Sequence, residues 1–209
     1  MKSMIKDAGI LFVITLFAGL VLGGVYQLTK EPIAQQEERA RTLARQEVFA
    51  DAQQFVEPGG FSQEAAADVM AAGGFNVSIN ECVMACDGSG NALGYVITVT
   101  THEGYGGDIR FAIGVRNDGT LNGISILSIA ETAGLGMRAE EVLKPQFADK
   151  NVESFVYTKT GATAENEIDA ISSATVTTSA VTNGVNAGLY YFRTQLQTLN
   201  ETEGGTGNE

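Results

Sequence analysis

The pattern of hydrophobic and polar residues begins with one long apolar run. Residues 8–29 contain no charged side chain. A helix of about 20 residues rises roughly 30 Å, which is enough to cross the hydrocarbon core of a bilayer. The run is longer than the roughly 7–15 residues of a signal-peptide core, and no small-x-small cleavage site follows it. We therefore predict a transmembrane helix at residues 8–29 and not a cleaved signal peptide.

Polar residues that favour helix follow the apolar run. Residues 30–58 are rich in Gln, Glu, Arg and Ala, which have high helix propensity. Their apolar residues are too sparse for a fully buried helix. We predict a helical stalk over residues 30–58, with the helix itself at residues 31–55 and a Pro-Gly-Gly linker after it. Ser62 then predicts the cap of a short helix that ends at Gly73.

The middle of the chain changes to the period of two that β-strands show. Four segments have this pattern: residues 79–87, 92–101, 109–115 and 121–128. In the third, Ile109 to Val115, apolar residues alternate with Arg110, Ala112 and Gly114, as expected of a half-buried strand. Turn residues separate the neighbouring segments, and the Asn-Asp-Gly-Thr turn is a strong hairpin signal. We predict an antiparallel sheet flanked by helices, and therefore an α+β domain over residues 59–200.

The last third of the chain holds a hydroxyl-rich turn that runs into a helix. The turn reads Ser172-Ser173-Ala174-Thr175, and apolar residues at helical spacing follow it: Val181, Val185, Leu189, Phe192 and Leu196. Such a turn can present several backbone N–H groups beside the partial positive charge of the helix end, and both favour a phosphate. The turn has no lysine of a Walker loop. From the residues alone, an ordinary Ser/Thr helix cap stays open as the alternative.

Charge and composition exclude several classes of function. The chain has 25 acidic and 13 basic residues and a formal charge of −12, whereas nucleic-acid binding needs a basic face. Its one histidine, His102, excludes a multi-histidine metal site. Cys82 and Cys86 lie four residues apart on one predicted strand, about 13 Å, and a disulfide needs Cα atoms within roughly 7 Å. We expect no metal site, no catalytic residue and two unbridged cysteines.

The hydroxyl-rich turn resembles the attachment motif that bacterial flavin transferases recognise. That motif is an Asp, two residues, Ser or Thr, a small residue, Ala or Ser, and then the acceptor Thr. Here Asp169 begins the motif and Thr175 ends it, with Ser173 in place of the usual Gly. In proteins with this motif, the phosphate of FMN is joined to the last threonine as a phosphodiester. The resemblance implies covalent FMN at Thr175, with these residues around it: Asp169, Ser172, Ser173, Ala174 and Thr178.

A second segment competes for the attachment. Residues 160–163 read Thr-Gly-Ala-Thr, which contains the usual Gly. However, Tyr157 stands where the motif has its acid, and the residues after Thr163 are polar and do not continue as an amphipathic helix. We therefore predict Thr175, and not Thr163, as the acceptor.

Three more segments match the same family in the same order: residues 94–96, 104–109 and 131–136. Ala133 stands where the family usually has Pro. With the single span, the whole pattern resembles the RnfG family, the G subunits of Rnf complexes, which are ion-translocating ferredoxin:NAD oxidoreductases. By this resemblance, one wall of the flavin site comes from Glu131, Thr132, Gly134 and Leu135, and another from Tyr105 and Gly106.

The resemblance implies a membrane-bound electron carrier without catalysis of its own. The flavin supplies the redox chemistry, and the protein supplies tethering and position. Electrons would pass between this FMN and the Fe–S and flavin centres of the other subunits, coupled to Na+ or H+ movement. The implied partners are those subunits, a flavin transferase during maturation and membrane lipid. A small excess of lysine in residues 1–7 favours a cytoplasmic N-terminus and an extracytoplasmic domain at the cell membrane.

Two alternatives stay open. The C subunit of the sodium-translocating NADH:quinone reductase, or a stand-alone FMN-domain protein, shares the same motifs. A cofactor-free, membrane-tethered binding module would instead use the hydroxyl-rich turn as a helix cap. At the end of the chain, residues 201–209 predict a disordered tail.

Overall fold

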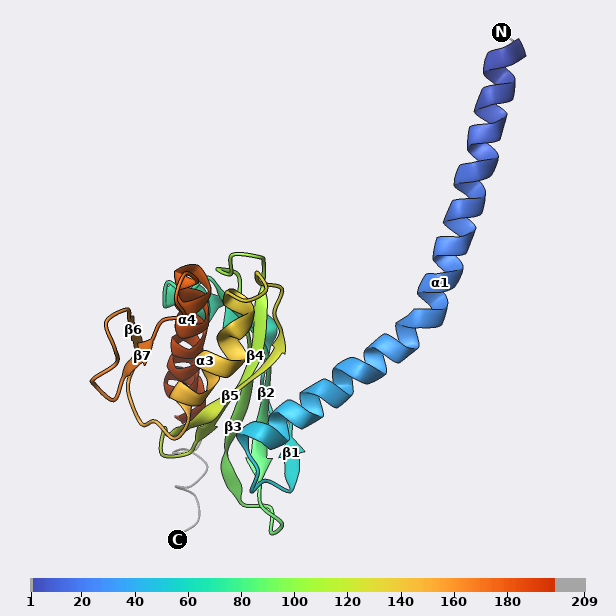
Figure 1. Cartoon of the computed structure of the whole chain (residues 1–209). Helices are drawn as coiled ribbons and strands as arrows, with labels where there is room; N and C mark the ends of the chain where they lie inside the picture. Colours follow the sequence, from blue (N-terminus) through green and yellow to red (C-terminus); the bar gives the residue numbers. More distant parts are fainter. Residues whose placement is uncertain (1, 198–209) are drawn as a thin grey trace. The chain divides into compact units, whose positions relative to one another are not determined.

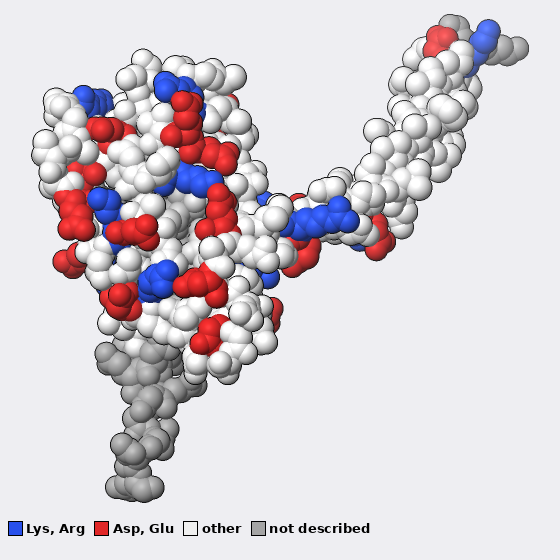
Figure 2. Space-filling model, turned by 60° about the horizontal axis from the view of Figure 1, so that its bottom comes forward, with Lys and Arg blue, Asp and Glu red and all other residues white. Residues whose placement is uncertain are grey.

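A long helix, α1, begins the chain. The computed structural model describes residues 2–197, and the chain divides into two compact units, Met1–Arg41 and Thr42–Glu209. Helix α1 spans Lys2–Val48, and its most apolar stretch has a mean hydropathy of 2.4 with none of it buried. Figure 2 shows this stretch as a white surface without acidic or basic side chains. By length and composition α1 can therefore cross a membrane, as residues 8–29 predict.

The predicted stalk differs from the structure at its end. Helix α1 continues past the internal Pro32 but stops at Val48, before residue 55. Residues Gln54–Val56 form the short strand β1 instead, paired antiparallel with β2. The backbone N–H of Gln53 donates to the carbonyl oxygen of Cys86 at 2.8 Å, which starts this pairing. Hydrogen bonds offered by the edge of β2 therefore outweigh the helix propensity of these residues.

A five-stranded antiparallel sheet forms the centre of the second unit, in the order β1-β2-β3-β4-β5 (Figure 1). The four longer strands are β2 (Val77–Cys86), β3 (Ala92–Thr101), β4 (Ile109–Arg116) and β5 (Leu121–Ser128). These bounds confirm the four predicted segments to within two residues. In the turn between β4 and β5, the carboxylate of Asp118 accepts the N–H of Thr120 at 2.9 Å, and Gly119 has a φ of +87°. Glycine adopts that backbone conformation without strain.

One face of the sheet packs against the end of α1, which the sequence pattern did not predict. Strand β4 is buried on both faces, not on one. Its small residues, Ala112 and Gly114, lie under this end of the helix: a Cβ at Gly114 would stand 2.7 Å from the carbonyl oxygen of Val48. Ala112, Val48 and Phe49 belong to an apolar cluster separate from the main core. This contact lies within the second unit, which begins at Thr42, whereas the α+β domain was predicted from residue 59.

The main core lies on the other face of the sheet, where α4 (Thr175–Tyr191) packs on β3 and β4. The approach is close because Gly188 faces the sheet: a Cβ there would stand 2.3 Å from Cδ1 of Ile113. The predicted apolar face is buried as expected, at Val181, Val185, Leu189, Phe192 and Leu196. Helix α2 (Gln63–Ala72) packs beside β2, and the Ser62 hydroxyl accepts the N–H of Ala65 at 3.4 Å, which confirms the predicted cap.

Short elements complete the second unit and give the predicted α+β class. They are η1 (Gly136–Arg138), α3 (Ala139–Val142), η2 (Lys144–Phe147), the parallel strand pair β6 (Val156–Thr158) and β7 (Glu167–Asp169), and η3 (Phe192–Leu196). Cys82 and Cys86 are buried and unbridged, as predicted, and burial raises the pKa of Cys82 to about 12. In residues 2–197 no three His, Cys, Asp or Glu side chains come together to hold a metal ion. The predicted tail at residues 201–209 lies outside the described residues.

Candidate functional site

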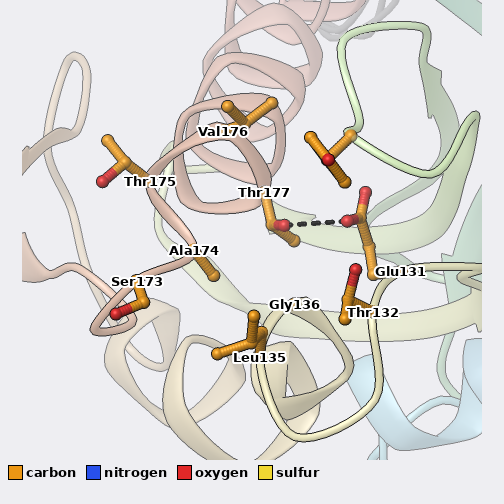
Figure 3. A pocket seen from close by; sticks show the side chains of 10 residues that line it. Glu131, Thr132, Leu135, Gly136, Ser173, Ala174, Thr175, Val176 and Thr177 are labelled. Atoms are coloured by element: carbon orange, nitrogen blue, oxygen red, sulfur yellow. Dashed lines mark hydrogen bonds between the residues drawn. The ribbon is translucent and has the colours of Figure 1, made fainter.

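A cavity of about 540 Å³ opens between the start of α4 and the segment that follows β5. Pockets of roughly 300–1,000 Å³ are typical of cofactor sites. The residues that line it are Tyr105, Glu131, Thr132, Leu135, Gly136, Ser173, Ala174, Thr175, Val176 and Thr177. Figure 3 shows Ser173, Ala174 and Thr175 on one side, with Glu131 and Thr132 across from them. The cavity therefore joins two segments that are far apart in the sequence.

The first turn of α4 forms one wall, and its end carries no side-chain cap. Its N-cap residue is Ala174, which makes no side-chain hydrogen bond to the helix. The alternative of an ordinary Ser/Thr helix cap is therefore wrong. Because the first N–H groups of a helix have no intrahelical acceptor, this end offers unpaired donors and a partial positive charge to the cavity. Both properties suit a phosphate group.

The turn before α4 is held in place by a buried hydroxyl. The side chain of Thr178 donates to the carbonyl oxygen of Ala174 at 2.9 Å and accepts the N–H of Ile171 at 3.1 Å. Ser173 sits between them with a φ of +64°. A left-handed conformation is uncommon for a residue other than glycine. The motif's usual Gly would adopt it without strain, which explains the residue type that the motif prefers.

Thr175 stands at the start of the helix, and its hydroxyl makes no hydrogen bond within the described residues. It is the first residue of α4, lines the cavity and is half-buried. The hydroxyl has no hydrogen-bond partner among residues 2–197. The N–H groups of the first turn of α4 belong to the same segment.

Glu131 ties the opposite wall to α4. Its side chain is buried, with 8% exposure. One carboxylate oxygen, Oε2, accepts the hydroxyl of Thr177 at 3.0 Å, drawn as the dashed line in Figure 3. The other, Oε1, accepts the backbone N–H of Gly106 at 3.2 Å. One side chain thus connects α4, the segment after β5 and the loop after β3.

Glycines beside Glu131 permit this close packing. A Cβ at Gly136 would lie 2.5 Å from the Thr177 hydroxyl and 2.7 Å from Cβ of Glu131. A Cβ at Gly104 would lie 2.8 Å from Oε1 of Glu131. Real Cβ atoms do not approach other atoms this closely, so any larger residue at either position would displace the carboxylate.

Apolar surface at the cavity is partly open to solvent. The exposed fractions are 73% for Tyr105, 49% for Val176 and 37% for Leu135. Large apolar side chains that stay exposed together around a cavity indicate a surface that a ligand or partner covers. The cavity therefore combines a polar end at the start of α4 with an apolar mouth.

The structure brings together seven of the predicted site residues and leaves five outside the cavity. Tyr105, Glu131, Thr132, Leu135, Ser173, Ala174 and Thr175 line it. Asp169, Ser172, Thr178, Gly134 and Gly106 do not. Gly106 still reaches the cavity wall through its bond to Glu131, and Thr178 acts on the turn from behind.

Three lining residues were absent from the predicted site: Gly136, Val176 and Thr177. Gly136 belongs to the matched segment 131–136, so the second glycine of that segment was a usable signal. Val176 and Thr177 follow Thr175 on the first turn of a predicted helix, where side chains surround the helix start. Nothing in the sequence pairs Thr177 with Glu131.

The competing threonine lies on a different surface. Thr163 is exposed on the loop between β6 and β7 and does not line the cavity. Its N–H and its hydroxyl both donate to Oε2 of Glu167, at 2.8 and 3.0 Å. These backbone and hydroxyl bonds lower the pKa of Glu167. The hydroxyl of Thr163 is therefore engaged, whereas that of Thr175 is not.

Two family models match this chain. Residues 104–190 match the FMN-binding domain, and residues 1–48 match the RnfG N-terminal region. The first span contains every residue that lines the cavity. The second ends where α1 ends.

Relatives of known function match over most of the chain. The G subunit of the Na+-translocating ferredoxin:NAD+ oxidoreductase complex of Acetobacterium woodii is 31% identical over 194 residues, 92% of this chain and 93% of that protein. The G subunit of the proton-translocating ferredoxin:NAD+ oxidoreductase complex of Clostridium ljungdahlii is 29% identical, over 86% of this chain and 90% of that protein. A crystal structure of Shewanella oneidensis NqrC overlaps with a TM-score of 0.46 and 18% identity, over 61% of this chain and 62% of that one. The similarities in sequence, which extend over helix α1 and the cavity alike, show that the chain belongs to the RnfG family of Rnf complexes and carries an FMN-binding domain.

Proposed function

We propose that this chain is the FMN-carrying, electron-transferring subunit of an ion-translocating ferredoxin:NAD+ oxidoreductase complex, with the flavin joined covalently to Thr175. The observation that carries the proposal is the position of Thr175, which begins α4 on the wall of the 540 Å³ cavity. The family and its FMN-binding domain supply the cofactor. The complex is inferred from the names of the relatives, which are subunits of ferredoxin:NAD+ oxidoreductase complexes. We propose that this chain contributes to that oxidoreductase without catalysis of its own.

The residues of the cavity fit the two ends of FMN. The uncapped start of α4 offers N–H donors and a partial positive charge to a phosphate. Ala174, the N-cap residue, is small enough to let that group approach the backbone. Tyr105, Leu135 and Val176 present partly exposed apolar surface to a planar ring. When bound, the isoalloxazine ring supplies the electron-transfer chemistry.

Attachment needs an activated flavin nucleotide. The hydroxyl oxygen of Thr175 would form a new bond to the flavin phosphorus, and the bond from that phosphorus to its leaving group would break. If the donor is a flavin dinucleotide, the leaving group is a nucleoside monophosphate, and the hydroxyl proton passes to solvent. We assign this step to a flavin transferase during maturation. The unpartnered hydroxyl of Thr175 suits an acceptor, whereas the hydroxyl of Thr163 is bonded to Glu167.

A covalent link also explains how an open cavity can keep its cofactor. With Tyr105 at 73% exposure, the mouth does not enclose a ligand. A tether removes dissociation, and the same exposure leaves the ring accessible to redox partners. We therefore propose that the noncovalent contacts of the cavity orient the flavin while the bond to Thr175 retains it.

We further propose a single-pass topology with a cytoplasmic N-terminus and an extracytoplasmic FMN domain. The support is the apolar part of α1, together with Lys2 and Lys6 on its short leading side. The proposed partners are the other membrane, Fe–S and flavin subunits of the complex, and membrane lipid around α1. One relative is named for Na+ and the other for protons, so either ion is compatible with this family.

In-gel flavin fluorescence tests the covalent site. The full chain is co-expressed with a flavin transferase as wild type, Thr175→Ala, Thr175→Ser and Thr163→Ala, and denatured before the gel. We expect fluorescence from the wild type and from Thr163→Ala, none from Thr175→Ala, and partial recovery in Thr175→Ser because its hydroxyl is retained. Fluorescence lost in Thr163→Ala would move the acceptor to the other loop. A dark wild type, beside a labelled known acceptor in the same cells, would favour the cofactor-free tethered module.

A further inference from the structure

Glu131 alone carries a charged side chain among the described residues that line the cavity. Glu131 is 8% exposed as a residue, and its carboxylate accepts two hydrogen bonds, both from neutral donors. Within residues 2–197 it has no ion pair with a lysine or an arginine. The charge that this side chain brings to the cavity is therefore compensated by dipoles and not by an opposite charge.

The carboxylate is also rigidly placed. The backbone N–H of Gly106 can only donate, which fixes Oε1 as its acceptor at 3.2 Å. The hydroxyl of Thr177 donates to Oε2 at 3.0 Å. A Cβ at Gly104 or at Gly136 would collide with the side chain of Glu131, so both positions need glycine. A charge held by donors on two sides acts on the cavity from one direction.

We propose that Glu131 has two roles toward the flavin: it lowers the flavin's reduction potential, and it holds the two walls of the cavity together. This inference rests on the proposed function, because it requires FMN in this cavity. Reduction at mildly alkaline pH adds two electrons and one proton to a flavin, so the ring gains one negative charge. A fixed carboxylate on the cavity wall repels that charge, and repulsion is stronger where water is partly excluded. Charge near the ring is one of the means by which proteins tune a flavin.

The charge role is tested by Glu131→Gln in the full, flavinylated chain. Glutamine keeps the shape and can accept from Gly106 through its amide oxygen, but it carries no charge. We expect a shift of the midpoint potential to higher values in a spectroelectrochemical titration. Glu141→Gln is the matched control, because the Glu141 side chain is 77% exposed and its ion pair with Arg138 is long at 3.8 Å. It should leave the potential unchanged, since exposed charges are screened by solvent.

The second role is tested by Thr177→Val, which keeps the charge and removes one of the two bonds. We expect its midpoint potential not to rise. We also expect lower fluorescence anisotropy of the bound flavin and a lower Tm of the flavin-free chain, because the segment after β5 is no longer tied to α4. The Tm of the flavin-free chain is a measurement that does not depend on the cofactor. It also applies to Glu131→Ala, which loses both hydrogen bonds.

The outcomes separate this inference from the proposed function. A wild type without bound flavin overturns the proposed function. A flavinylated Glu131→Gln whose potential equals that of the wild type overturns the charge role and leaves the proposed function standing. A Thr177→Val with unchanged anisotropy and Tm overturns the connecting role. If Glu131→Gln does not fold while Thr177→Val does, a higher potential in Thr177→Val would contradict the charge role, because the carboxylate is still present.

Discussion

Asp169 and Thr175 belong to one sequence motif but meet different partners in the structure. Thr175 lines the cavity, whereas the carboxylate of Asp169 accepts the N–H of Ala162 at 2.7 Å. The N–H of Asp169 in turn donates to Oε1 of Gln146 at 2.6 Å. Asp169 therefore fixes the backbone of the loop between β6 and β7 and does not line the cavity. We assign it a positioning role, through the loop that lies before the turn at residues 172–175 in the chain.

This assignment predicts different effects for two substitutions. Asp169→Asn keeps an oxygen acceptor for Ala162, so the proposed flavinylation of Thr175 should fall only a few-fold. Asp169→Ala removes the acceptor, leaves the N–H unpaired and should slow flavinylation on the order of ten-fold, since a hydrogen bond contributes about 0.5–1.5 kcal/mol. The measurement is the initial rate of flavin incorporation into purified, flavin-free chain. If Asp169→Asn is as slow as Asp169→Ala, the transferase reads the charge itself and the positioning role fails.

The sequence predicted the contiguous part of the site better than its contacts across the chain. Ser173, Ala174 and Thr175 follow one another in a motif, so a local pattern was enough. The bond from Thr177 to Glu131 joins residues far apart in sequence, and only packing brings them together. Gly136 is necessary because that bond leaves no space for a Cβ. Local periodicity in the sequence indicates neither the bond from Thr177 to Glu131 nor the need for glycine at position 136.

At the scale of elements, the last turn of α1 is the main feature that periodicity missed. Helix propensity placed this segment in a stalk, yet tertiary contacts attach it to the sheet. The guanidinium of Arg45 pairs with Glu81 at 2.6 Å, and the carbonyl oxygen of Val48 accepts the side chain of Asn122 at 2.8 Å. Glu47 binds both Ser125 and Lys144. The strands were predictable because each one has its own alternation of apolar and polar residues. The contacts of α1 were not predictable, because they involve residues that only the folded sheet brings together.

The attachment of α1 to the sheet should depend on pH. Burial opposes the charge of Glu47, but hydrogen bonds from Lys144 and Ser125 hold its pKa below the ordinary 4.5. Its contribution to stability is therefore present above about 4.5 and lost as the pH falls through the folded value. Replacing Glu47 by Gln should cost about 0.5–1 kcal/mol at neutral pH, because the pair is partly exposed. Urea unfolding across this pH range should show the difference from the wild type shrinking in acid.

A constant difference between Glu47→Gln and the wild type at every pH would mean that packing and not charge attaches the helix.

Lys144 gives the matching test at the alkaline end. Burial lowers its pKa, but the bond to Glu47 outweighs this and raises the pKa above 10.5. Its contribution is therefore present below 10.5 and lost as the pH rises through the folded value.

At the scale of the whole molecule, the boundary between the two units falls inside one helix. The first unit ends at Arg41, and the second begins at Thr42, although α1 continues to Val48. Residues 42–49 are therefore part of the globular unit, and they cover one face of its sheet. A transmembrane run and an α+β domain could both be predicted from local patterns. The residue at which the α+β domain begins could not be predicted from local patterns, because it depends on the space that Ala112 and Gly114 leave for the helix.

Two shortened chains test where the folding unit begins. A chain that starts at residue 42 keeps Val48 and Phe49, which are 3% and 0% exposed, and should remain soluble and cooperative in thermal unfolding. A chain that starts at residue 50 loses both side chains, and removing one buried Phe alone costs about 3–5 kcal/mol, a large part of the roughly 5–15 kcal/mol that stabilises a domain. It should lose its sharp transition and aggregate through the uncovered sheet. Phe49→Ala in the longer piece is the control and should fall between the two. Equal Tm values for both starts would show that residues 42–49 only connect the apolar part of α1 to the sheet and do not stabilise the sheet.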